Sequence, residues 1–108
     1  MRNGLYRVAF HNVHGRGSGV IYAAGGKLRG GNSAFAFVGS YTASGDHVSV
    51  KIMTRHHTEE PGYTPLFGEA TIVLQGKVLG DTVNFEGSAL QLPGVPLQVA
   101  LSLIEPDA

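Results

Sequence analysis

The chain of 108 residues contains no cysteine. This absence excludes a disulfide scaffold, a zinc site with thiolate ligands and a cysteine nucleophile. It leaves the redox compartment open, with a preference for the cytoplasm, where disulfides are rare. A chain of this length makes one domain, because a single core of this size already buries roughly two-thirds of the surface of the unfolded chain.

The sequence also has no excess of charge of one sign and no long apolar run. Eight Lys and Arg balance eight Asp and Glu, so the formal net charge is zero. Without a basic field that attracts polyanions, we expect no nucleic-acid partner and no membrane partner. No stretch approaches the roughly 20 apolar residues of a membrane span, and no apolar signal segment follows Met1. The sequence therefore predicts a soluble, unprocessed cytoplasmic protein.

What the sequence does have is an alternation of apolar and polar side chains with a period of two. Hydrophobic residues make up 43% of the chain, charged residues only 15%, and 16 residues are glycine. This composition is typical of many short strands joined by tight turns, and no window shows the spacing of an amphipathic helix. The alternation predicts eight strands, at residues 5–11, 18–24, 27–29, 33–43, 47–56, 66–75, 82–90 and 97–105.

Eight consecutive strands with mostly hairpin-length connections predict an all-β fold, an eight-stranded antiparallel up-and-down barrel of the lipocalin or calycin type. Closure removes the sheet edges that an open sandwich, the alternative, would leave exposed. The Gly25-Gly26 pair is a strong hairpin signal, and residues 57–65 form the one long irregular connection. We expect the strand glycines Gly39, Gly68 and Gly87 where a strand bends or approaches another backbone.

Two parts of the chain resemble each other. GKLRG at residues 26–30 is similar to GKVLG at 76–80, and Phe37 and Gly39 find counterparts in Phe85 and Gly87. The likeness predicts that the single domain, residues 1–108, consists of two duplicated four-stranded halves, at 1–56 and 66–105.

Five aromatic residues are the candidate lining of a ligand pocket. An eight-stranded barrel is just wide enough to be filled by side chains or to hold one small ligand. At this chain length inward aromatics more often fill the core, although small Ala and Gly residues on the same strands would leave some volume unfilled. The candidate ligand-binding residues are Tyr6, Phe10, Phe35, Phe37 and Phe85.

Four motifs in the first half of the chain carry a family resemblance. They are NGLYRVAF at 3–10, GSGV at 17–20, GKLRGGNS at 26–33 and FAFVGSY at 35–41. These motifs resemble the GrlR family, named for a negative regulator of type III secretion genes in enteric pathogens. The resemblance implies a calycin-like barrel, usually a homodimer, that binds a transcriptional activator rather than DNA.

The resemblance also implies a partner-binding turn. In the regulator itself, an acidic run in the turn after the fourth strand contributes to holding the activator. The corresponding residues here are Ser44, Gly45, Asp46 and His47, of which one is acidic. The chain departs from the family a second time at Asn32, where the family usually has Asp after the double glycine.

Five histidines raise the question of a metal site or an enzyme. His56 and His57 are adjacent, so on a strand they point to opposite faces, and no pair of ligands is spaced to share a face. We expect no metal, no cofactor and no catalytic residue. An enzyme in which these histidines work with Glu59 and Glu60 as a general base ranks third among the hypotheses; solvated side chains on a loop are the simpler interpretation.

The first hypothesis is therefore a non-enzymatic regulatory binding protein, a dimeric barrel that sequesters a protein partner. The alternative is a lipocalin-like carrier of a small apolar ligand. The strand at 47–56 is a candidate dimer face, because Met53 lies among its outward polar positions.

Overall fold

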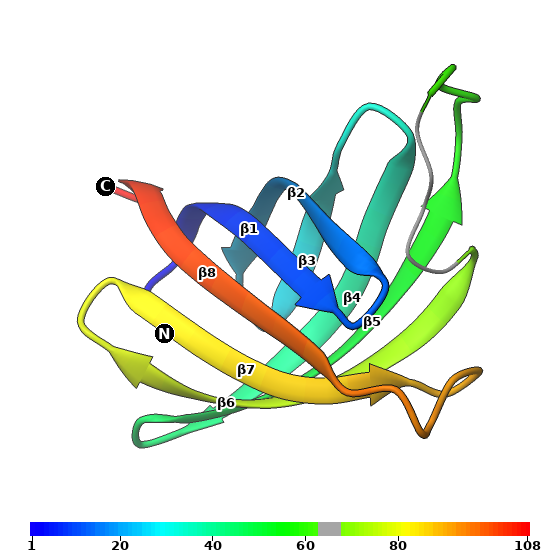
Figure 1. The fold of residues 1–108 in the computed structure, drawn as a ribbon. Coiled ribbons are helices and arrows are strands. Elements are labelled where there is room, and N and C mark those ends of the chain that lie inside the picture. Colours follow the sequence, from blue (N-terminus) through cyan, green and yellow to red (C-terminus); the bar gives the residue numbers. More distant parts are fainter. Residues whose placement is uncertain (63–67) are drawn as a thin grey trace.

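The computed structural model describes residues 1–62 and 68–108, and within them the chain forms a closed antiparallel barrel of eight strands (Figure 1). Each strand pairs with the next, and β8 pairs back with β1. The strands are β1 (Gly4–Asn12), β2 (Gly15–Ala24), β3 (Lys27–Gly31), β4 (Phe35–Ser44), β5 (His47–His56), β6 (Ala70–Leu79), β7 (Thr82–Ala89) and β8 (Leu97–Pro106). The expected fold class, an all-β up-and-down barrel, is confirmed.

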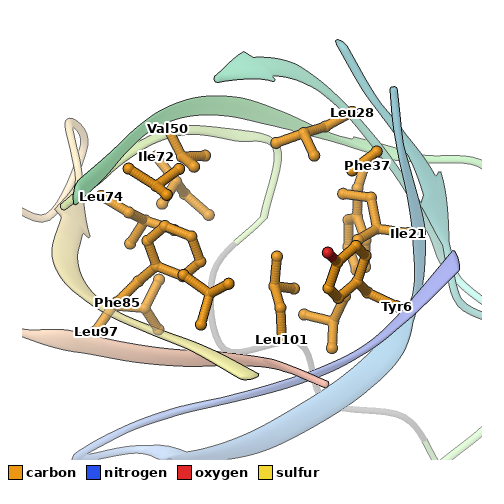
Figure 2. Close-up of a cluster of buried hydrophobic side chains, with 14 of the residues drawn as sticks. Tyr6, Ile21, Leu28, Phe37, Val50, Ile72, Leu74, Phe85, Leu97 and Leu101 are labelled. Carbon is orange, nitrogen blue, oxygen red and sulfur yellow. The ribbon is translucent and has the colours of Figure 1, made fainter. Parts of the chain in front are cut away.

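The alternation of side chains decides which face of each strand looks inward. On β1, Tyr6 and Val8 are buried while Arg7 between them is exposed, and the same period of two runs through the other strands. Figure 2 shows the inward side chains from opposite walls converging on one core. The buried hydrophobic residues are Tyr6, Val8, Ile21, Ala23, Leu28, Ala34, Phe35, Phe37, Val48, Val50, Ala70, Ile72, Leu74, Val83, Phe85, Ala89, Leu97 and Leu101.

The barrel has two unlike ends. Two-residue turns at 25–26, 45–46 and 80–81 lie at one end together with residues 1–3, and we call it the turn end. Gly25 and Gly26 both have positive φ, 57° and 79°, as a tight hairpin turn requires. The connections at 13–14, 32–34 and 90–96 and the described start of the β5–β6 connection, residues 57–62, lie at the other end, the loop end.

Two strands begin more than two residues away from the predicted position, while β1 begins one residue earlier and β4 two residues later than predicted. β2 begins at Gly15 rather than residue 18, and β6 spans Ala70–Leu79 rather than 66–75; Leu66 and Phe67 lie outside the described residues. In both cases glycines hide the pattern. Gly17 and Gly19 on β2 and Gly76 on β6 occupy inward positions but add no apolar side chain to the periodicity.

The prediction for the strand glycines is right at two positions and wrong at the third. A Cβ at Gly39 would collide with the backbone of Lys51 and Ile52, and one at Gly87 with the backbone of β6. Gly68 precedes β6, and a Cβ there would meet no atom within 4 Å. The first two therefore allow neighbouring strands to approach closely, as glycine does in strongly curved sheets.

The two similar segments occupy different places in the strand order. Residues 26–30 begin in the β2–β3 turn and continue into β3, whereas residues 76–80 form the end of β6 and the start of its turn. The duplication of two halves stays a prediction.

Candidate functional site

The barrel interior contains a small apolar cavity. Its volume is about 60 Å³. Known ligand pockets are larger, on the order of 300–1,000 Å³. The cavity is lined by Val8, Phe10, Ile21, Leu28, Phe37, Val50, Ile52, Thr54, Ile72, Leu74, Phe85, Leu97, Val99 and Leu101.

Three of the five aromatic candidates line this cavity, and two do not. Phe10 and Phe37 pack edge to face, with ring centroids 6.1 Å apart, and Phe85 lines the cavity from β7. Tyr6 is 2% exposed, and its hydroxyl donates a hydrogen bond of 2.5 Å to the carbonyl of Arg2 at the turn end. Phe35 packs against the ring of His56, with centroids 5.1 Å apart. The prediction of aromatic lining residues thus leaves out the aliphatic side chains that make up most of the lining, although the alternation marks them as inward.

Each cavity-lining phenylalanine covers an inward glycine. A Cβ at Gly17 would lie 2.5 Å from the ring of Phe10, and one at Gly19 would lie 3.0 Å from the ring of Phe37. The ring of Phe85 covers Gly76 in the same way. The rings therefore fill the volume that the glycines leave open, as aromatic side chains do when they shield glycine in a sheet.

Two polar residues near the loop end hold the wall together, a role that the alternation of side chains does not predict. The buried hydroxyl of Thr54 donates to the carbonyl of Gly68 and accepts from the amide of Ala70, both at 3.0 Å. Asn32 lies just beyond β3, where its Oδ1 accepts from the amides of residues 34 and 35 and its Nδ2 donates to the carbonyl of Ser18 at 2.9 Å. An Asp at position 32 could not make this last bond, because an ionised carboxylate only accepts.

The predicted partner-binding turn is exposed, and it is tied to β6. Ser44, Gly45, Asp46 and His47 are all exposed. Asp46 pairs with Lys77 at 3.6 Å, and His47 Nε2 lies 2.7 Å from Oε1 of Gln75. His47 and Lys77 also border an open depression that continues over β6 and β7. The turn presents one carboxylate, and a lysine already neutralises it.

The histidine–carboxylate pair is not assembled among the described residues. His57 Nδ1 lies 2.6 Å from the Thr58 hydroxyl, and its Nε2 lies 3.1 Å from the carbonyl of Asn32. No hydrogen bond or ion pair within residues 1–62 and 68–108 joins His56 or His57 to Glu59 or Glu60. The same part of the chain holds no cluster of three or more His, Asp or Glu that could bind a metal.

The outer wall carries a feature that the overall charge balance conceals. Strands β3, β4 and β5 contain four Lys and Arg and no Asp or Glu. All four cationic residues are exposed on the outer face. We call this surface the basic face; it consists of Lys27, Arg29, Val38, Ser40, Lys51, Met53 and Arg55. A count of charges by segment rather than over the whole chain would have revealed it.

Among the described residues, no helix is long and apolar enough to cross a lipid bilayer. A scan of the chain against protein-family models finds no match, and a search of curated proteins finds no significant relative. The resemblance to the GrlR family therefore stays a prediction based on the four motifs.

Proposed function

We propose that the protein is a non-enzymatic regulatory binding protein of the cytoplasm, a homodimeric barrel that sequesters a protein partner such as a transcriptional activator. The observation that carries this proposal is the filled interior. Apolar side chains leave only about 60 Å³ inside the barrel, too little for a typical small-molecule site. The outer wall is then the surface available for recognition.

Two further features support the proposal. The motifs of the first half resemble a family of regulators that act by protein binding. The outer wall also exposes several large apolar side chains, among them Tyr22, Met53 and Ile104, at 43%, 39% and 53% exposure. Tyrosine and methionine are among the residues enriched in protein–protein interfaces. The cytoplasmic location rests on the absence of cysteine.

Photo-cross-linking in cells of the native host tests this function. A benzophenone amino acid replaces Tyr22, Met53 or Ile104 on the outer wall, and the unsubstituted chain, irradiated in the same way, serves as the control. We expect a discrete adduct with one partner from at least one outward position and none from the control.

The purified barrel should then reduce promoter binding by that partner in a gel-shift titration. Unchanged promoter binding, or no adduct from any outward position, would contradict the proposal.

The alternative function, a carrier of a small apolar ligand, is favoured by the chemistry of the cavity. Thirteen of its fourteen lining residues are hydrophobic, Thr54 being the polar one. A carrier should retain an apolar ligand that native mass spectrometry detects after purification, and it should take up a hydrophobic dye. Empty protein without dye uptake would eliminate this alternative.

A further inference from the structure

The basic face concentrates cations around an apolar centre. Cross-strand pairing places Arg29 beside Val38 and Val38 beside Met53 in one row. The next row places Lys27 beside Ser40, Ser40 beside Lys51 and Lys51 beside Val73 of β6. Because neighbouring strands lie about 4.8 Å apart, Lys27 and Lys51 lie roughly 10 Å apart on either side of Ser40. In the apolar row, Arg29 borders Val38, and Met53 lies between Lys51 and Arg55 along β5. The surface thus offers positive charge on both sides of a small hydrophobic patch.

The cations of this face have no carboxylate partner in the described part of the chain. The two ion pairs found there join Arg2 to Asp81 and Lys77 to Asp46. Arg29 instead donates to the carbonyls of Leu28 and Gly39. Three acids near the face are bound elsewhere. Asp46 is bound to Lys77, and Glu69 accepts a hydrogen bond from the amide of His56. Asp107 accepts one from Tyr22, the cross-strand neighbour of Arg29 on β2.

We propose that the basic face docks an acidic polypeptide segment that carries an apolar side chain. This inference rests on the proposed protein-binding function and names the chemistry of its partner. Carboxylates of the segment would pair with Lys27, Arg29 and Lys51, and its apolar side chain would cover Met53 and Val38. Complementary charge of this kind steers encounter and selects the partner.

Two other modes of recognition fit the same surface less well. Strand addition requires a free sheet edge, whereas β3, β4 and β5 are paired on both sides over the basic face. Single-stranded nucleic acid requires a series of aromatic platforms for its bases, whereas the outward positions of β3–β5 carry no Phe, Tyr or Trp. One exposed ring, Tyr22 of β2, lies beside Arg29, and its hydroxyl is bound to Asp107. Four cations are also few for a duplex, since DNA-binding proteins commonly contact about 6–10 phosphates.

Peptide binding by the purified full chain tests the inference. The probe is a short fluorescent peptide that alternates glutamate and leucine, and the matched probe replaces each glutamate by lysine. We expect anisotropy to show binding of the glutamate peptide alone, weakening as salt screens the charges. Lys51→Glu and Arg29→Glu should each weaken binding by about tenfold or more. Arg7→Glu on the outer face of β1 makes the same charge change elsewhere and should weaken it less than about twofold.

Several results would overturn the inference. One is equal weakening by Lys51→Glu and Arg7→Glu, which would mean that only net charge matters. Others are equally tight binding of a single-stranded oligonucleotide, or self-association of the chain that Lys51→Glu abolishes. If the glutamate peptide fails to bind while photo-cross-linking captures a partner at another wall, this inference falls and the proposed function stands. If the peptide binds as expected but no cellular partner is captured, the proposed function falls instead.

Discussion

At the scale of single residues, the buried hydroxyl of Thr54 joins β5 to the start of β6. Thr54→Val keeps the shape of the side chain but leaves the amide of Ala70 without its acceptor. A buried unsatisfied amide costs about 1–3 kcal/mol, so we expect the free energy of unfolding to fall by that amount in urea denaturation. Thr42→Val, at an exposed position of β4, should change it by less than about 0.5 kcal/mol. Equal stability of the two variants would contradict this role.

Tyr6 gives the protein a dependence on alkaline pH. Burial raises the pKa of the Tyr6 phenol above its ordinary value of 10.0, and nearby Tyr41 and Asp81 add to the rise while Arg2 opposes it. A group with a raised folded pKa contributes stability that is complete below the unfolded pKa and is lost as pH rises through the folded pKa. We therefore expect the free energy of unfolding to decline above pH 10.0.

Tyr6→Phe provides the measurement. The variant loses the hydrogen bond to Arg2, which costs about 1 kcal/mol near neutral pH, but it has no proton to lose at position 6. The difference in stability between the wild type and the variant should shrink as the pH rises through the folded pKa of Tyr6. A constant difference over that range would show that Tyr6 does not cause the decline.

At the scale of the strands, close approach of β6 and β7 depends on Gly87. A Cβ at this position would collide with the backbone of Val73 and Leu74, which a rotamer change cannot relieve. Gly87→Ala should therefore destabilise the barrel by about 1–3 kcal/mol or more, as overpacking does. Gly68→Ala, with no atom within 4 Å of the new Cβ, should change stability by less than about 1 kcal/mol. The urea midpoints of the two variants test this explanation. A lower midpoint for Gly87→Ala than for Gly68→Ala supports it, and equal midpoints would mean that both glycines serve only chain flexibility.

The alternation predicts the strands well where both faces carry side chains. β5 is predicted at its observed bounds, residues 47–56, because Val48, Val50 and Ile52 alternate with polar residues without interruption. β2 and β6 are misplaced because inward glycines add nothing to the pattern, and their partners Phe10, Phe37 and Phe85 come from other strands. Because these rings come from other strands, the volume of the cavity cannot be predicted from the sequence. The roles of Thr54 and Asn32 depend on bonds across strands, which local patterns do not reveal.

At the scale of the whole molecule, zero net charge hides a segregation of charge. Residues 80–108 contain four acids and no Lys or Arg, whereas residues 27–56 contain four Lys and Arg and a single acid, Asp46, in the turn between β4 and β5. In a closed barrel of eight strands, β4 and β8 lie on opposite sides. In a two-fold symmetric dimer the same surface patch of both subunits forms the interface. A dimer through the basic face would bring like charges together, so this face is a poor dimer interface.

We therefore expect the proposed homodimer to form through the outer face of β8, β1 and β2, in place of the candidate face on β5. There the small residues Ala9 and Ala100 lie side by side, and Ile104 is exposed on the same wall. Ala100→Arg should shift the mass measured by light scattering from dimer to monomer, while Met53→Arg should leave the dimer intact. A monomeric Met53→Arg variant, or a wild type that is already monomeric at micromolar concentration, would contradict this arrangement.

The filled interior yields the last prediction. The wild-type cavity of about 60 Å³ is well below the roughly 150 Å³ of an engineered apolar cavity that binds benzene. Phe37→Ala removes a ring that lines the cavity and covers Gly19, and a buried Phe→Ala change costs about 3–5 kcal/mol. We expect this variant, where it remains folded, to gain stability from added benzene in thermal unfolding, while the wild type gains none. The milder Phe37→Leu keeps the test informative if the larger deletion unfolds the chain, since it should gain less than Phe37→Ala and more than the wild type. Stabilisation of the wild type by benzene would mean that the interior opens to ligands, and the carrier function would then replace binding at the outer wall.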